Sequence, residues 1–406
     1  MIDLATRMEA LVSNLNRSRV LVRIVEIRTA AAGQTPEWSH SRFEAERASI
    51  ERLIGDGRHS EAARAAQALH LKCEAVGGTA YDGAAYDGAV AQVALGRALQ
   101  MRGSAEAALP HLEQARQRLE RLNATRMAGV ALTDKADCLK DLGRYEEAAE
   151  AYQQTIATME RVSDPRSGSA VKIQLATVRL LQKNLSEALR LYTEAREVFE
   201  RLNEPTMVAT VWHQIGRVYQ EAGKYELAEQ AYQKSLSIKV QIGNRAAQAS
   251  TLTQLAHLYS ALGRPQEAIR LHRQAADIDL ANGDLRNEGI DRNNIASELT
   301  TLRRFDEARV EVERAIECDR PFGHVAEPWE TFAILSNLEL AAGNQPAALE
   351  ARAKAINAYL AYRRDGGAPQ IDVSAIPPGL DPADPEVPYR VAAEILVALG
   401  ESASAS

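Results

Sequence analysis

The sequence has few cysteines, no long apolar run and no excess of basic residues. Its three cysteines, Cys73, Cys138 and Cys318, stand at no short spacing within 406 residues, which argues against a disulfide framework or a zinc knuckle. No stretch approaches the roughly 18 apolar residues of a membrane-spanning helix, and residues 1–12 lack the basic start and apolar core of a signal peptide. We therefore expect a cytoplasmic protein with no membrane segment.

The charge balance and the lack of catalytic motifs exclude further classes of function. Lysine and arginine number 48 against 55 aspartates and glutamates, a net charge of −7. A general nucleic-acid binder needs a surplus of basic side chains to neutralise phosphates, so no nucleic acid is expected as a partner. The sequence contains no Gly-x-x-x-x-Gly-Lys-Ser/Thr loop, no His-Glu-x-x-His and no Gly-x-Ser-x-Gly. We expect no enzymatic activity, no cofactor and no metal.

What the sequence does contain is a repeated unit. In residues 204–243, apolar residues at helical spacing predict two amphipathic helices, about 205–222 and 225–241, with a glycine turn between them. The turn position recurs at a constant step of 40 residues, at Gly103, Gly143, Lys183, Gly223, Gly263, Arg303 and Gly343. A small residue stands before each turn, at Gly96, Ala136, Ala176, Gly216, Ala256, Ala296 and Ser336. An alanine follows each turn, at Ala108, Ala148, Ala188, Ala228, Ala268, Ala308 and Ala348. A period of this length with helical spacing indicates an all-α solenoid whose paired helices approach closely at the small residues.

The unit resembles the tetratricopeptide repeat. The residues that match its signature are Trp212, Ile215, Gly216, Tyr219, Ala228 and Tyr232, with Ser235 in place of the last alanine. The resemblance covers about residues 84–362 and implies a right-handed superhelix of helical hairpins. Repeats of 40 residues, rather than the usual length of about 34, are similar to those of the Leu-Gly-Asn-rich adaptor and of kinesin light chains. They are also similar to the sensor regions of bacterial regulators.

Seven clear units span residues 84–364. Residues 37–83 hold a degenerate repeat, with Gly57 at the turn position, and part of a Tyr/Gly-rich segment at 77–88. This segment carries a tandem Ala-Tyr-Asp-Gly-Ala duplication, which we interpret as a surface loop. Exposed tyrosines in such a loop can bind a partner, although a duplication tolerated at the surface is the favoured interpretation.

The two ends of the chain do not follow the repeat. We predict an N-terminal helical cap over residues 1–36, because a solenoid needs a cover on its terminal face. Residues 365–388 are rich in proline and are predicted to be an extended linker. Residues 389–400 are predicted to be a helix that docks on another element, since it is too short to be stable alone. Residues 401–406 are expected to be a disordered tail.

The resemblance also implies where a ligand binds. In stacked hairpins the first helix of each unit lines a concave groove. When the turn residue is numbered 15, family geometry places positions 5, 6 and 9 of each unit among the groove residues. The polar side chains that we predict there are Arg97, Asp134, Asp137, Gln174, Thr177, His213, Gln214, Arg217, Gln254, His257, Asn293, Asn294 and Asn337, with Thr133, Thr253 and Ser297 at the same positions.

The side-chain amides of this groove suit one function in particular. An amide offers both a donor and an acceptor, so a column of Gln and Asn can hold the backbone of an extended peptide. The same residues can instead form hydrogen bonds between neighbouring helices, which is a structural role. Both interpretations are left open, and the peptide-binding one is favoured.

The histidines allow a metal or catalytic interpretation. His213 and His257 lie in adjacent units, but no third ligand has the spacing of a zinc site, so packing is favoured. His70 and Cys73 stand one helical turn apart, as a base and a nucleophile can, but such a pair on an amphipathic helix more often packs. His272 replaces an aromatic residue of the repeat and is expected in the core.

We therefore expect a scaffold that binds a protein or an extended peptide in its concave groove. The alternative is the ligand-sensing region of a larger bacterial regulatory or defence protein, with an effector domain upstream or on a partner chain. An enzyme that uses the first 80 residues or the tyrosine segment is a third, disfavoured hypothesis.

Overall fold

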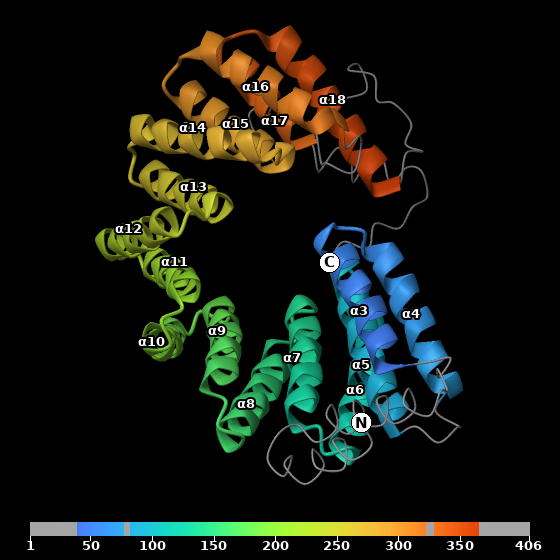
Figure 1. Cartoon of the computed structure of the whole chain (residues 1–406). Helices are drawn as coiled ribbons and strands as arrows, with labels where there is room; N and C mark the ends of the chain where they lie inside the picture. Colours follow the sequence, from blue (N-terminus) through green and yellow to red (C-terminus); the bar gives the residue numbers. More distant parts are fainter. Residues whose placement is uncertain (1–38, 77–81, 322–328, 365–406) are drawn as a thin grey trace. The chain divides into compact units, whose positions relative to one another are not determined.

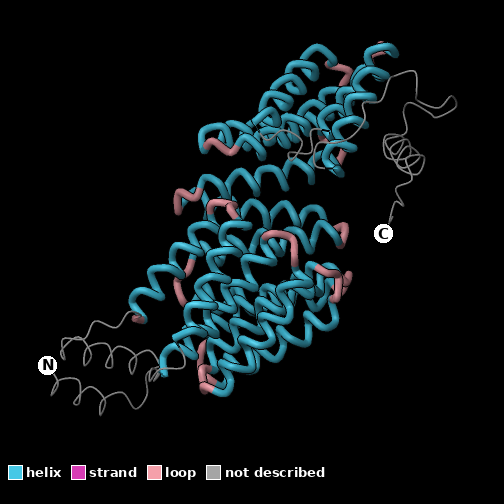
Figure 2. The backbone as a smooth tube through the Cα atoms, turned by 90° about the vertical axis from the view of Figure 1, so that its right-hand side faces the viewer, coloured by secondary structure: helices cyan, strands magenta, loops and turns pink. Residues whose placement is uncertain are grey.

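The computed structural model describes residues 39–76, 82–321 and 329–364, and within these ranges it contains helices and turns but no strand (Figures 1 and 2). The chain divides between Met207 and Val208 into two compact units, which are described separately. The predicted N-terminal cap, proline-rich linker, docking helix and tail lie outside the described residues.

The helices follow one another as hairpins. Those of the first unit are α3 (His40–Gly55), α4 (His59–Val76), α5 (Asp82–Met101), α6 (Ala105–Arg121), α7 (Thr125–Asp141), α8 (Tyr145–Arg161), α9 (Pro165–Leu181) and α10 (Leu185–Arg201). Helix α11 (Pro205–Glu221) begins just before the boundary. The rest of the second unit comprises α12 (Tyr225–Gln241), α13 (Arg245–Ala261), α14 (Pro265–Asn282), α15 (Leu285–Thr301), α16 (Phe305–Asp319), α17 (Trp329–Ala341) and α18 (Gln345–Arg364). The two helices predicted for residues 204–243 are thus confirmed as α11 and α12.

Within each compact unit, successive hairpins also contact one another through their first helices. In the first unit α3 contacts α5, α5 contacts α7 and α7 contacts α9, while in the second unit α15 contacts α17. Within each compact unit a second helix packs against its own first helix and against the first helix of the following hairpin, as α6 does with α5 and α7 and α14 does with α13 and α15. Side chains of successive first helices therefore come together although they are far apart in the sequence.

The predicted turn residues adopt the left-handed backbone conformation that ends a helix. Gly223 has φ +68°, and the two non-glycine turn residues, Lys183 and Arg303, have φ values of 60° and 57°. At the first of these turns the Lys224 amide donates to the Tyr219 carbonyl at 2.8 Å and the Gly223 amide to the Gln220 carbonyl at 3.0 Å. These two bonds satisfy helix-end carbonyls and reverse the chain. The same conformation recurs between hairpins at Asn123, Ser163, Asn203, Gly243 and Gly283.

The small residues of each hairpin stand where its two helices approach. A Cβ atom added to Gly216 would lie 2.6 Å from ring carbons of Tyr232, and one added to Gly96 would lie 2.5 Å from Leu112. Ala228 is fully buried, and the alanines at the same position of the other 40-residue repeats are buried too. The close approach predicted from the sequence is therefore confirmed.

Replacing Ala228 with leucine is expected to destabilise the α11–α12 hairpin by about 1–3 kcal/mol, because the larger side chain overpacks a filled contact. Gln230→Leu is the matched control, since Gln230 is exposed on the same helix and should change stability by less than about 0.5 kcal/mol. Thermal unfolding followed by circular dichroism compares the two variants. Equal shifts in Tm would show that position 228 is not a packing position.

The interpretation of residues 77–88 as a surface loop is wrong for residues 82–88, which form the first turns of α5. Tyr86 and Asp87 are buried there, with Asp87 Oδ1 2.8 Å from Nδ1 of His40 in α3. A Cβ atom on Gly88 would lie 3.4 Å from Cβ of Cys73 in α4. This glycine therefore allows two helices to approach and does not mark a loop, and Tyr86 is not an exposed tyrosine for a partner.

Candidate functional site

The predicted groove residues of the first unit are largely bonded to one another or to the core. Arg97 Nη2 donates to Asp134 at 2.9 Å, and Arg97 Nη1 donates to Glu51 at 3.3 Å. Asp134 is buried, and this burial raises its pKa to about 6 although Arg97 opposes the shift. These three charges link α3, α5 and α7, which is a structural role.

Two further groove residues of this unit accept or share bonds with buried tyrosines. Tyr152 donates to Asp137 at 2.5 Å, and the hydroxyls of Thr177 and Tyr192 are 2.8 Å apart. Gln174 is half-buried and forms no side-chain hydrogen bond among the described residues. Of the candidates in the first unit, Gln174 is thus the one whose amide is open to a ligand.

In the second unit the residues at position 5 join successive first helices. His213 Nδ1 lies 3.2 Å from Thr251 Oγ1, Thr253 donates to Asp291 at 3.0 Å, and Asn293 donates to Thr331 at 2.8 Å. The three bonds connect α11 to α13, α13 to α15 and α15 to α17. Each spans 38 residues, so one geometry repeats with the hairpins. Position 5 therefore has a structural role here.

The residues at position 6 and some at position 9 behave differently. Gln254 and Asn294 form no side-chain hydrogen bond with any described residue, and Asn294 Nδ2 is buried without a partner. Gln214 accepts a bond from Arg217 at 3.0 Å. Asn337 is exposed. Gln254 therefore keeps its donor and its acceptor available to a ligand, whereas Asn294, whose Nδ2 is buried, offers its Oδ1 acceptor alone.

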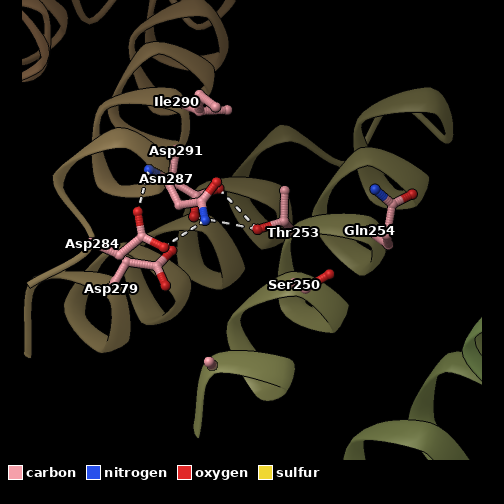
Figure 3. A pocket seen from close by; sticks show the side chains of 9 residues that line it. Ser250, Thr253, Gln254, Asp279, Asp284, Asn287, Ile290 and Asp291 are labelled. Atoms are coloured by element: carbon pink, nitrogen blue, oxygen red, sulfur yellow. Dashed lines mark hydrogen bonds between the residues drawn. The ribbon is translucent and has the colours of Figure 1, made fainter. Parts of the chain in front are cut away.

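Two pockets lie on either side of Gln254. The first, of about 190 Å³, is formed by α13, the end of α14 and α15 (Figure 3). Its lining residues are Ala246, Ser250, Thr253, Gln254, Asp279, Asp284, Asn287, Ile290 and Asp291. The second, of about 380 Å³, is lined by Arg217, Gln220, Glu221, Tyr225, Gln254 and Ala261. The Gln254 amide thus stands between two hollows on the first-helix side of the second unit.

His213 and His257 are packed among core side chains, and no three His, Cys, Asp or Glu side chains of the described residues are placed to hold a metal ion. Burial, with the nearby Lys239 and Arg217 charges, lowers the pKa of His213 to about 3. His257 stacks edge-on against His272 with ring centroids 5.2 Å apart. His272 is fully buried, with Nδ1 2.7 Å from Asp291 Oδ1.

The disfavoured pairing of His70 with Cys73 as base and nucleophile is not formed. His70 Nδ1 lies 3.1 Å from the Gly88 carbonyl oxygen instead. Burial raises the pKa of the Cys73 thiol to about 12, so it is not a thiolate nucleophile at neutral pH.

No helix within the described ranges is both long and apolar enough to span a bilayer.

Sequence reasoning missed Asp279 and the α14–α15 turn, because it considered first helices alone. A signal was present. Position 279 belongs to a 40-residue series that reads Leu119, Met159, Phe199, Lys239, Asp279 and Asp319. A core position that changes from apolar to ionisable marks a place where a special interaction is needed.

Comparison with known proteins identifies the repeats. Residues 87–281 match the tetratricopeptide repeat family in four overlapping segments, 87–161, 127–201, 168–239 and 207–281. No curated protein matches the sequence.

Among solved structures, similarity extends over most of the chain at low sequence identity. A Signal Transduction ATPase with Numerous Domains protein with a tetratricopeptide repeat sensor, from Pyrococcus horikoshii, has a TM-score of 0.57 and 18% identity and is matched over 87% of this chain and 53% of its own. A Rap protein complexed with competence and sporulation factor has a TM-score of 0.52 and 13% identity, over 89% of this chain and 93% of its own. The apo form of RapI has a TM-score of 0.51 and 13% identity, over 68% and 99%. These likenesses and the family match confirm the expected fold class, an all-α solenoid of tetratricopeptide hairpins.

Proposed function

Because residues 87–281 of this chain are tetratricopeptide repeats, we propose that it is a non-catalytic binding protein that holds an extended peptide segment of its partner along the first helices. The main support is the difference between positions 5 and 6 in the second unit. Position 5 joins the hairpins, whereas Gln254 and Asn294 at position 6 have no partner among the described residues.

The chemistry of an amide matches that of a peptide backbone. An extended peptide presents N–H and C=O groups that lose water when it binds, and each needs a partner. Gln254 can donate and accept at the same time, and the pockets on its two sides give neighbouring peptide side chains room. In such a groove the amides bind the peptide backbone, and the pockets select among the peptide's side chains.

The double variant Gln254→Ala/Asn294→Ala tests the proposal. The probe is the tightest dodecapeptide selected on the full chain from an unbiased display library. Each lost hydrogen bond should cost about 0.5–1.5 kcal/mol, so the affinity should fall about fivefold to 150-fold by calorimetric titration. The Tm should not fall, because neither amide bonds another described residue.

The matched control is Gln230→Ala/Gln274→Ala, which removes two exposed amides from the second helices α12 and α14. It should leave the affinity unchanged within about twofold. A double groove variant that melts normally and binds the peptide as tightly as the unchanged chain would place the ligand elsewhere. A lowered Tm with unchanged affinity would assign position 6 a structural role.

A second candidate function is that of a ligand-sensing region of a larger regulatory or defence protein. Its support is the likeness to the Pyrococcus horikoshii protein, of whose length this chain spans about half. Hydrogen exchange of the chain with and without the selected peptide separates the two functions. A scaffold should gain protection at the groove helices alone, whereas a sensor should also change protection in helices that do not contact the peptide.

A further inference from the structure

The pocket beside Gln254 carries a strong excess of negative charge. Three aspartates, Asp279, Asp284 and Asp291, line it, and none of the described residues that line it is basic. Figure 3 shows Asp279 and Asp284 on one wall, with Asp291 between them and Thr253. The distribution of bonds among the three carboxylates is uneven.

Two of the three aspartates form hydrogen bonds with other described residues. Asp284 accepts a hydrogen bond from the backbone N–H of Asn287 at 3.2 Å and another from the Asn287 side chain at 2.8 Å, so it caps the N-terminus of helix α15. Asp291 lies 2.7 Å from His272 Nδ1 and accepts from Thr253 at 3.0 Å. Asp279 is 5% exposed, yet its carboxylate forms no hydrogen bond or ion pair with any described residue.

The equivalent residues of the neighbouring hairpins show what Asp279 lacks. Lys239 donates to Thr251 at 2.6 Å, and Asp319 accepts from Thr331 at 2.9 Å, in each case twelve residues further along the chain. The residue twelve positions after Asp279 is Asp291, a carboxylate that cannot donate a bond once ionised. The repeat therefore brings a buried anion against a second anion at this hairpin and nowhere else in the series.

We infer that this pocket binds the side chain of a lysine or arginine in the partner peptide, with Asp279 as its charge partner. The inference rests on the proposed function, since the peptide backbone would lie on the neighbouring Gln254. A metal ion does not fit, because the described residues offer no group of three ligating side chains suited to one. At about 190 Å³ the pocket is also smaller than the roughly 300–1,000 Å³ typical of small-molecule sites, which favours a single side chain.

Electrostatics agrees with this geometry. Burial, with the like charges of Asp291, Asp284 and Glu288, raises the pKa of Asp279 to about 6. The carboxylate is thus ionised at pH 7.5 with no compensating positive charge from the described residues that line the pocket, which is unfavourable until a cation arrives. Below pH 6 it takes up a proton and loses its attraction for a cation.

The test uses the full chain and the same unbiased dodecapeptide library. Selection is run in parallel on the unchanged chain, on Asp279→Asn and on Asp277→Asn, the last being an exposed aspartate on the same helix that controls for net charge. We expect the unchanged chain and Asp277→Asn to select peptides with lysine or arginine at one fixed position. Asp279→Asn should select peptides without that preference.

A synthetic peptide then isolates the single contact. Replacing its conserved arginine with citrulline, or its lysine with norleucine, should weaken binding to the unchanged chain at least about tenfold. The same replacement should alter binding to Asp279→Asn by less than about twofold, and the preference for the cation should fade between pH 7.5 and pH 5. In the absence of peptide, Asp279→Asn should melt higher than the unchanged chain at pH 8, because stability lost as pH rises through about 6 is restored.

The outcomes separate the two proposals. Peptides selected without any basic preference, or with one that survives in Asp279→Asn, would overturn the cation pocket and leave the groove function intact. A library from which the unchanged chain enriches no peptide would overturn the groove function, and the cation pocket with it.

Discussion

Replacing Arg292 with methionine is expected to destabilise the second unit by about 3–5 kcal/mol. Arg292 is 5% exposed and donates to Glu288 at 3.0 Å and to Glu311 at 3.0 Å. Both carboxylates are also buried, so the variant would leave Glu288 without its cation and Glu311 with the more distant Arg273, at 3.8 Å, alone. Urea unfolding followed by circular dichroism measures the loss, and hydrogen exchange in α15 and α16 locates it.

Two further variants make this result specific. Arg286→Met removes an exposed arginine from the same helix and should cost less than about 0.5 kcal/mol. The triple variant Glu288→Leu/Arg292→Met/Glu311→Leu should recover much of the loss, because buried ion clusters contribute little net stability over apolar side chains of similar size. If Arg286→Met and Arg292→Met were equally destabilising, the buried cluster would not be the cause.

Replacing Tyr232 with alanine is expected to cost about 3–5 kcal/mol, the range for deleting a large buried aromatic side chain. Tyr232 is fully buried between α11 and α12, its ring stands edge-on to His213 at 5.5 Å, and its hydroxyl donates to Gln220 at 2.9 Å. The variant would leave a cavity at the closest contact of the hairpin. Urea unfolding of the full chain gives the change in free energy.

Gly216→Val provides the matched test in the same contact. Alone it should destabilise by about 1–3 kcal/mol through overpacking, since its Cβ would lie 2.6 Å from the Tyr232 ring. Combined with Tyr232→Ala, the valine should fill the cavity, so the double variant should be more stable than Tyr232→Ala alone. Simple addition of the two single losses would mean that Gly216 and Tyr232 do not share one space.

The fold was predictable because its determinants are local and periodic. Glycine at Gly223 favours the left-handed conformation whatever surrounds it, and Lys183 and Arg303 adopt the same conformation because they occupy the same turn of the repeat. Gly216, Ala228 and Tyr232 stand at fixed positions of the repeat, so the contact of Gly216 with the Tyr232 ring and the burial of Ala228 follow from helix geometry. One clear 40-residue repeat was therefore enough to predict where the helices of the other repeats begin and end.

The site was only partly predictable, because its chemistry depends on pairs that packing creates. The sequence placed Asn293 and Asn294 together in the groove, but only the structure shows that Asn293 bonds Thr331, 38 residues away, whereas Asn294 is left without a bonded partner. Consecutive residues of a helix point in directions about 100° apart. Whether a side chain's donors and acceptors form hydrogen bonds therefore depends on which neighbouring hairpin that side chain contacts. That choice has no local signature.

The sequence by itself determined the period, the turns and the small residues between paired helices, since each depends on backbone geometry within a few residues. Only the tertiary structure decided that residues 82–88 belong to a helix, because burial of Tyr86 and Asp87 against α3 and α4 outweighs a loop-like composition. It also decided that Asp279 faces Asp291 and not a threonine, which leaves a buried carboxylate without a partner among the described residues. Burial and pairing are set by residues twelve to forty positions apart, so they arise only when the hairpins stack.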